Sequence, residues 1–306
     1  MAVADTSEAA VSIRRLCKHY GRVVAVRELN LEARRGEVLG FLGLNGAGKS
    51  TTIRVLLDLL RPTSGQALVF GSDCQRESLA VRRMIGYLPG ELGLYADLTG
   101  REVLEFLGDI GPHRIDARYR AELQERLSLN DGDLRRRWSE HSTGMKRKVG
   151  IIQALQGQPP LLILDEPTEG LDPLVQSAFY ELLADLRRRG QTVFMSSHVL
   201  SEVERVCDRI ALLRQGELVL LATVAEVRKL AARRVRVTFA HDVQPPSAWP
   251  VGHEVIAVRP RSWELRVTVP LGSLLELLMP LAVVDMDVQE PRLEDVLLHY
   301  YRGRAG

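Results

Sequence analysis

A glycine-rich loop that ends in a lysine and a serine is the part of the sequence best suited to chemistry. Residues 43–50 read Gly-Leu-Asn-Gly-Ala-Gly-Lys-Ser and fit the pattern Gly-x-x-x-x-Gly-Lys-Ser/Thr at every fixed position. Because glycine has no Cβ, such a loop can take positive φ and turn its N–H groups toward an anion. The loop is therefore predicted to bind nucleotide phosphates. We expect the contacts to come from Gly43, Leu44, Asn45, Gly46, Ala47, Gly48, Lys49, Ser50 and Thr51.

The elements on either side of the loop are predicted to hold it in place. The apolar run 38–42 is typical of a buried parallel strand, and a helix is predicted from Lys49 to about Leu60. The positive end of that helix would face the phosphates, with the Lys49 ammonium reaching the β and γ groups. The hydroxyl of Ser50 would be a ligand for Mg²⁺.

Acidic residues follow a second predicted strand, the apolar run 161–164. Ligands of open α/β sheets collect at the carboxyl ends of the strands. We therefore expect Asp165 to hold Mg²⁺ and Glu166 to act as the base for an attacking water. His198 follows another predicted strand, 192–195, where it would touch the γ-phosphate. Helix capping for the acids and a structural role for the histidine are the alternatives.

Composition limits the classes of protein that fit. The chain has 306 residues, of which 45% are hydrophobic, so a large domain and a smaller one are expected. The 41 basic and 39 acidic residues nearly balance, which does not favour nucleic-acid wrapping. Three scattered cysteines indicate reduced thiols in a cytosolic protein. The start of the chain does not resemble a signal peptide, and no apolar run is long enough to span a membrane.

The order of the predicted elements gives an α/β fold class with a parallel sheet core. An antiparallel β subdomain is expected from residue 11, before the loop, and a helical subdomain is expected at about residues 90–159. After the core, a basic helix at about 225–236 leads into strands near 235–239, 254–258 and 263–269, a helix at 271–278, a strand at 283–288 and a last helix from Arg292. We expect a flexible tail at 1–10, a nucleotide-binding domain at 11–225 and a small α+β accessory domain at 226–306.

The motifs, taken in order, resemble the ATPase subunits of ATP-binding-cassette (ABC) transporters over roughly residues 11–221. The most discriminating match is residues 142–146, Ser-Thr-Gly-Met-Lys, which is similar to the family signature LSGGQ and is absent from other phosphate-loop enzymes. The resemblance implies a RecA-like P-loop fold. It makes Tyr20 the aromatic that stacks on adenine, Asp172 the D-loop aspartate and His198 the switch histidine. Ser142 and Gly144, at a predicted helix start, would bind the nucleotide of the opposite subunit.

The resemblance also implies cofactors and partners. It implies ATP and Mg²⁺, a head-to-tail homodimer with two composite sites, and separate transmembrane permease subunits. The chain would then be peripheral on the cytoplasmic face of the membrane, with no nucleic acid expected. Gly90 stands where the family usually has a glutamine, and Thr143 replaces a glycine of the signature. Together with residues 291–301, these features resemble a branch of bacterial drug, lipid and polysaccharide exporters, so ATP-driven export is the leading hypothesis.

Two other functions fit the same phosphate loop. A soluble ABC-type ATPase that acts on ribosomes or DNA is the first alternative. Only 116 positions separate Lys49 from Asp165, without heptads, which is too short for the long coiled coil of DNA-repair members. A small-molecule kinase is the second alternative, and the signature-like residues 142–146 disfavour it. The sequence leaves open the transported molecule, the permease and the role of residues 226–306.

Overall fold

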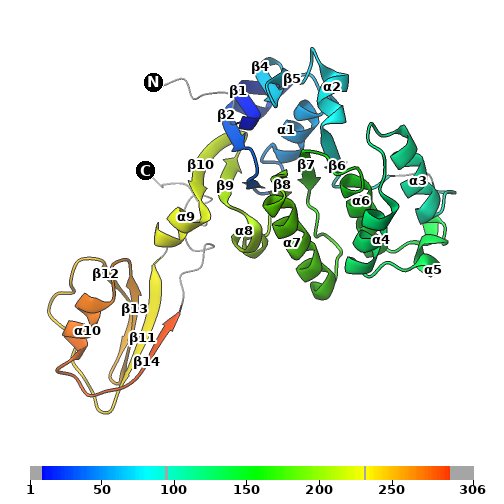
Figure 1. Ribbon diagram of the computed structural model, residues 1–306. Helices are drawn as coiled ribbons and strands as arrows, with labels where there is room; N and C mark the ends of the chain where they lie inside the picture. Colours follow the sequence, from blue (N-terminus) through cyan, green and yellow to red (C-terminus); the bar gives the residue numbers. More distant parts are fainter. Residues whose placement is uncertain (1–8, 94–95, 231, 290–306) are drawn as a thin grey trace. The chain divides into compact units, whose positions relative to one another are not determined.

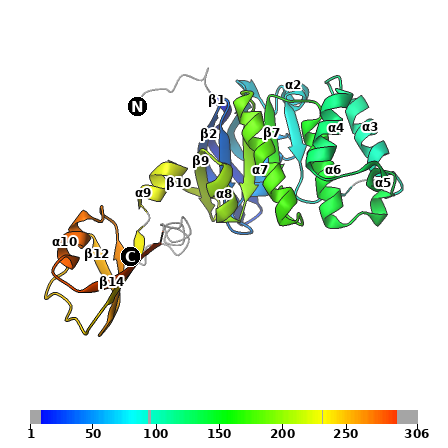
Figure 2. The same ribbon diagram turned by 60° about the horizontal axis from the view of Figure 1, so that its bottom comes forward.

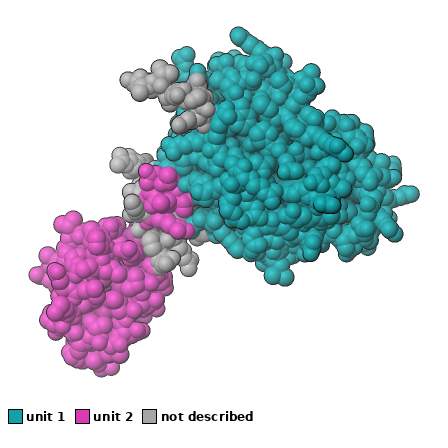
Figure 3. Space-filling view, viewed as in Figure 1, with its two compact units in different colours: residues 1–222 teal, residues 223–306 magenta. Residues whose placement is uncertain are grey.

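The computed structural model describes residues 9–93, 96–230 and 232–289. The chain divides into two compact units, residues 1–222 and 223–306, which are coloured separately in Figure 3. Each unit has its own hydrophobic core among its described residues.

A six-stranded sheet forms the centre of the first unit, in the order β10-β9-β3-β8-β7-β6. The strands are β3 (Val38–Leu42), β6 (Ile85–Leu88), β7 (Leu161–Asp165), β8 (Thr192–Ser197), β9 (Arg209–Arg214) and β10 (Glu217–Thr223). β3, β7 and β8 are buried at every residue and pair in parallel, as their continuous apolar runs predict. The carboxyl ends of these three strands therefore meet at one edge of the sheet.

An antiparallel sheet in the order β2-β1-β4-β5 lies beside the central sheet, above it in Figure 1. Its strands are β1 (Ala9–Tyr20), β2 (Val23–Arg34), β4 (Ser64–Val69) and β5 (Ser72–Asp73). Helix α1 (Lys49–Leu56) shares one core with strands of both sheets, which includes Ile13, Phe41 and Ile53. The predicted end of α1 at Leu60 is wrong, because Asp58 takes a left-handed backbone with φ of 51° just after the helix.

Helices between β6 and β7 confirm the prediction of a helical insertion. They are α3 (Gly100–Ile110), α4 (Ala117–Arg126), α5 (Asp131–Leu134), a short 3₁₀ helix (Trp138–Glu140) and α6 (Thr143–Leu155), and they gather at one end of the unit (Figure 2). Thr99 and Glu102 close the start of α3 with a reciprocal capping box. Arg126 of α4 forms an ion pair at 2.6 Å with Asp185 of helix α7 (Pro173–Arg188), which ties the insertion to the α/β part.

The remaining helices of the first unit are α2 (Ser78–Arg83), α7 (Pro173–Arg188) and α8 (Leu200–Val206). α8 packs directly on β3 at Gly40. A Cβ added at Gly40 would lie 2.7 Å from Cγ1 of Val203 and 2.9 Å from Sγ of Cys207. Only glycine therefore allows this contact between helix and strand.

The second unit confirms the expected α+β fold. It contains α9 (Val224–Leu230), β11 (Arg233–Phe239), β12 (His253–Arg259), β13 (Ser262–Val267), α10 (Gly272–Leu278) and β14 (Val283–Gln289), with sheet order β12-β13-β11-β14. Trp263 is buried in its core. The predicted basic helix at 225–236 is wrong beyond Leu230, because β11 already begins at Arg233. The predicted helix from Arg292 lies outside the described residues.

Cys17, Cys74 and Cys207 are free, and burial raises the pKa of the Cys74 thiol to about 12. No helix among residues 9–93, 96–230 and 232–289 is both long enough and apolar enough to cross a bilayer.

Candidate nucleotide-binding site

The glycine-rich loop joins β3 to α1 at the carboxyl edge of the central sheet. Gly46 and Gly48 have φ of 79° and 105°, in the region that favours glycine. A Cβ at Gly48 would lie 2.5 Å from the carbonyl oxygen of Ala25, and one at Gly43 would lie 2.7 Å from that of Leu213. The loop conformation therefore requires glycine at the fixed positions of the motif.

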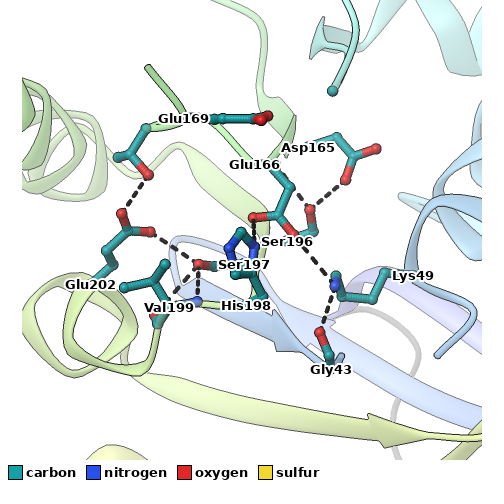
Figure 4. Close-up of polar contacts among 12 residues, drawn as sticks. Gly43, Lys49, Asp165, Glu166, Glu169, Ser196, Ser197, His198, Val199 and Glu202 are labelled. Carbon is teal, nitrogen blue, oxygen red and sulfur yellow. Dashed lines mark hydrogen bonds and ion pairs between the residues drawn. The ribbon is translucent and has the colours of Figure 1, made fainter. Parts of the chain in front are cut away.

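Lys49, Glu166 and His198 meet at the same edge, as Figure 4 shows. The Lys49 ammonium donates to the carbonyl of Gly43 at 2.5 Å and lies 3.3 Å from Oε1 of Glu166. Oε2 of Glu166 lies 2.8 Å from Nδ1 of His198. The Glu166 side chain is 19% exposed and that of Lys49 is 6% exposed. A carboxylate with low exposure is thus held between an ammonium and an imidazole.

Ser196 at the end of β8 fixes the backbone that carries the two acids. Its hydroxyl donates to Oδ1 of Asp165 at 2.5 Å and accepts from the backbone N–H of Glu166 at 3.1 Å. Glu166 itself has a left-handed backbone with φ of 49°, which is uncommon for a residue with a side chain. Such strain clusters at functional sites. The turn after β7 is therefore specifically shaped around Glu166.

Asp165, Glu166 and the glycine-rich loop surround a cleft of about 600 Å³. The lining includes the predicted residues Leu44, Asn45, Gly46, Ala47, Gly48, Lys49, Ser50, Thr51, Asp165 and Glu166. Loop N–H groups and an ammonium are suited to phosphates, and a hydroxyl beside a carboxylate is a donor set that suits Mg²⁺. The residues present therefore fit a nucleotide with its metal ion. No cluster of three His, Cys, Asp or Glu side chains that would hold a metal alone occurs among the described residues.

Six of the predicted site residues lie outside the lining of this cleft, namely Tyr20, Gly43, Ser142, Gly144, Asp172 and His198. The Tyr20 side chain is 46% exposed at the end of β1, with Nζ of Lys18 5.1 Å from its ring centre. Ser142 caps the start of α6 by accepting from the N–H of Met145 at 3.2 Å. Gly144 follows in the first turn of α6, where its added Cβ would lie 2.5 Å from the carbonyl of Gly170.

Asp172 is another of these residues, and it caps the start of α7. It accepts from the N–H groups of Leu174 and Val175 at 3.1 and 3.0 Å. The hydrogen bond from Val175 lowers the pKa of this carboxyl. Within one chain, Asp172 and Ser142 therefore act as helix N-caps.

Arg147 of α6 reaches the segment where the usual glutamine is replaced by Gly90. Its guanidinium donates to the carbonyls of Pro89 and Gly90 at 2.9 and 2.8 Å and forms an ion pair with Glu169 at 3.2 Å. Arg147 is 3% exposed, and its burial lowers the pKa of the guanidinium. Glu91 lines the cleft beside Gly90. A side chain on the signature helix thus holds the backbone of this segment.

Sequence reasoning missed some residues around the cleft. Arg54, Tyr87 and Glu169 also line it. Burial, together with the nearby charge of Asp165, raises the pKa of the Tyr87 hydroxyl to about 12. Arg54 is four residues after Ser50, and residues at this spacing lie on the same face of a helix, so its position beside the cleft could have been predicted. Tyr87 lies in a short strand, β6, and the sequence around it contains no motif that predicts a place beside the cleft.

The fold and the cleft define a phosphate-loop nucleotide-binding protein. The family profile described as "ABC transporter" matches residues 26–169. The bacitracin transport ATP-binding protein BcrA of Bacillus licheniformis is 42% identical over 205 residues, which cover 66% of each chain. The ABC transporter ATP-binding protein NatA of Bacillus subtilis is 38% identical over 201 residues, 64% of this chain and 81% of NatA. The chain belongs to the ATP-binding proteins of ABC transporters, the ABC ATPase family.

Solved structures agree with this family. An ATP-binding subunit of an ABC transporter has a TM-score of 0.66 and 30% identity, with 72% of this chain and 92% of that chain covered. A dimeric ATP-binding cassette, solved in a post-hydrolysis state with ADP and Pi, has a TM-score of 0.64 and 26% identity, with 70% and 98% covered. The chain spans about two thirds of the length of the bacitracin transport protein.

Proposed function

We propose that this chain binds ATP and Mg²⁺, hydrolyses ATP as a homodimer, and powers export through separate transmembrane subunits at the cytoplasmic face of the membrane. The observation that carries the proposal is the contact of Glu166 with both Lys49 and His198 beside the glycine loop. A base, a phosphate-binding ammonium and an imidazole are the groups that phosphoryl transfer to water requires. They come from three parallel strands that end at one edge.

In this proposal the chain's own groups divide the work. The N–H groups of the loop and the Lys49 ammonium bind the β and γ phosphates, and Ser50 and Asp165 hold the metal ion. Bound Mg²⁺ would offset the negative charge that develops on the phosphate oxygens. Ser196 keeps the Asp165 carboxylate oriented through their short hydrogen bond.

Glu166 is the proposed base for the attacking water. Its Oε1 contacts Lys49, so the ammonium must turn toward the phosphates before this oxygen can accept a proton. Its Oε2 keeps the contact with Nδ1 of His198, which fixes the orientation of both side chains. His198 is 50% exposed and contacts Glu166, so its ring would be accessible to a γ-phosphate bound next to Glu166. His198 thus orients the Glu166 carboxylate, and a movement of Lys49 toward the phosphates would leave Oε1 free to accept a proton.

A second copy would complete each site. Ser142, Gly144 and Asp172 lie at helix starts outside the cleft of their own chain. Free N–H groups at a helix start bind anions well. In a head-to-tail dimer these residues would face the partner's γ-phosphate, and Tyr20 would stack on adenine in its own chain. The dimeric cassette among the similar structures supports this arrangement.

An apolar cleft of about 390 Å³ is the proposed docking place for a cytoplasmic helix of the permease. Its lining comes from the end of α1, from β6 and the segment after it, and from α3 and α6, and includes Leu57, Leu59, Leu92 and Leu107. Leu59 is 59% exposed. Such apolar surface on a chain of balanced charge favours a protein partner over nucleic acid.

The proposal of export rests on relatives whose names include bacitracin transport and linearmycin resistance. These relatives give no support to a soluble ATPase that acts on ribosomes or DNA. Purification of the chain from native membranes, with its partners identified by mass spectrometry, tests the assignment. We expect a polytopic membrane protein to copurify. Recovery of ribosomes or nucleic acid in its place would overturn the transport proposal.

The hydrolysis proposal is tested by Glu166→Gln. The amide keeps the size of the side chain but cannot accept a proton from water, so we expect turnover to fall by about 100-fold or more. ATP binding and ATP-dependent dimerisation should remain. Glu181→Gln, on the exposed face of α7, is the matched control and should turn over like the wild type. Wild-type turnover in Glu166→Gln would reject Glu166 as the base.

A further inference from the structure

A buried carboxylate outside the cleft joins the two segments that carry Glu166 and His198. Glu202 lies on α8 and is 8% exposed. Its Oε1 accepts from the hydroxyl of Thr168 at 2.5 Å, and its Oε2 accepts from the hydroxyl of Ser197 at 2.9 Å. Figure 4 shows Glu202 beside Ser197 and on the side of the site away from Lys49. Glu202 does not contribute to the lining of the cleft.

The two hydroxyls have a defined relation to the reactive side chains. Thr168 is two residues after Glu166, and Ser197 is the residue directly before His198. Ser197 also accepts from the backbone N–H of Val199 at 2.9 Å, so both flanks of His198 are fixed. One carboxylate therefore bridges two chain segments whose own side chains meet at 2.8 Å between Glu166 and His198.

The bridge uses both oxygens of the carboxylate. Each hydroxyl donates its single proton to a different oxygen of Glu202, so an amide in its place would present an NH₂ donor to one of the two hydroxyls. Burial of a charged group is costly unless it is hydrogen-bonded, and hydrogen bonds to a charged group are stronger than neutral ones. Tyr180 and Arg205 border the site, with the Arg205 guanidinium 4.9 Å from the Tyr180 ring centre. Burial, with Glu202 nearby, raises the pKa of Tyr180 to about 12.

We propose that Glu202 is a positioning residue for ATP hydrolysis. Its carboxylate holds the segments of Thr168 and Ser197 together and so fixes Glu166 against His198. This inference rests on the proposed ATPase function. Glu202 acts on the geometry of the base and the switch histidine, while the glycine loop and Lys49 bind the phosphates. Loss of the bridge should therefore reduce the rate of the chemical step and leave nucleotide affinity unchanged.

Glu202→Gln is the first test, because the amide has the same shape but only one acceptor oxygen. We expect kcat for ATP to fall about tenfold or more, because small misplacements of reacting groups reduce rates by such factors. The Kd for ATP and the ATP-dependent dimer should not change. Glu181→Gln, the same change on exposed α7, should leave kcat unaltered. Thermal unfolding of each variant shows whether the fold is intact.

Thr168→Val gives an independent test if Glu202→Gln does not fold. Valine has the shape of threonine without its hydroxyl, so it removes one of the two hydrogen bonds and keeps the buried charge. It should lower kcat in the same direction. A double-mutant cycle with His198→Ala then measures whether Glu202 acts through the histidine: the fold-change caused by Glu202→Gln should be smaller in the His198→Ala background.

The outcomes separate this inference from the ATPase proposal. If Glu202→Gln and Thr168→Val both turn over like the wild type while Glu166→Gln does not, the positioning role is overturned and the ATPase assignment stands. An equal fold-change with and without His198 also overturns the positioning role, because it shows an effect that does not pass through the histidine. If the wild type does not hydrolyse ATP, both proposals fail.

Discussion

The left-handed backbone of Glu166 leads to a prediction about stability that is independent of catalysis. Glu166 has φ of 49°, and its carboxylate contacts Lys49 and His198. Glu166→Ala and Glu166→Gly both remove that carboxylate, so a comparison of the two variants isolates the backbone. Alanine still places a Cβ in the left-handed region, whereas glycine does not.

The expected difference can be worked out from two opposing effects. A Cβ in the left-handed conformation costs about 1–2 kcal/mol. Glycine lowers the free energy of unfolding by about 0.4–1 kcal/mol relative to alanine, because the unfolded chain has more conformational freedom at a glycine. The net result favours Glu166→Gly by about 1 kcal/mol in free energy of unfolding, which is about a fivefold change in the unfolding equilibrium constant.

Hydrogen exchange of the β8 amides measures this difference within the first unit. β8 is buried and pairs with β7, which leads into Glu166, but it does not contain the substituted residue. Its slowest amides should exchange about fivefold more slowly in Glu166→Gly than in Glu166→Ala. Glu181, inside helix α7, gives the matched control with the opposite sign, because glycine there is about 1 kcal/mol less favourable than alanine.

Equal exchange in the two Glu166 variants, or faster exchange in Glu166→Gly, would refute the reasoning. Either result would mean that the backbone at this position is not strained by a side chain. The activity of the two variants does not enter the comparison, since both lack the proposed base.

Two further predictions concern ties between the helical insertion and the α/β part. Arg147→Met leaves the carbonyls of Pro89 and Gly90 without their buried partner, so the free energy of unfolding in urea should fall by about 2 kcal/mol, and an unchanged value would contradict that role. The hydrogen bond from Arg126 lowers the pKa of Asp185 below its ordinary value of 3.8, so its contribution to stability is present above that pH and is lost as the pH falls through the folded pKa. Denaturation of wild type and Asp185→Asn should therefore differ at pH 7 and converge under acid, and a constant difference would argue against the pair.

The parts of the site that follow from backbone rules were predictable from the sequence. The positions of Gly46, Gly48 and Lys49 require particular residue types, and the buried strand before Asp165 is a continuous apolar run. Parallel strands place their ends together, so the meeting of Lys49 with Glu166 follows from the fold class. The roles assigned to Tyr20, Ser142, Gly144 and Asp172 stay predictions.

The parts that depend on distant side-chain contacts were not predictable. Thr168 and Glu202 are 34 positions apart, and a threonine and a glutamate at these positions carry no local pattern. The end of the basic helix was missed for a different reason. Residues 233–239 have many arginines, but Val235, Val237 and Phe239 are buried at every second position, which is the period of a strand. A strand was predicted at 235–239, but the basic helix was extended to residue 236 because of its Lys and Arg content.

The close contact at Gly40 has a mechanical consequence for the site. β3 leads into the glycine loop, and α8, which carries Glu202, is in direct contact with β3 because Gly40 has no side chain. Closely packed elements transmit displacements to their neighbours, so a shift of β3 should displace α8 as well. We therefore expect a movement of the glycine loop on nucleotide binding to reach the helix that carries Glu202.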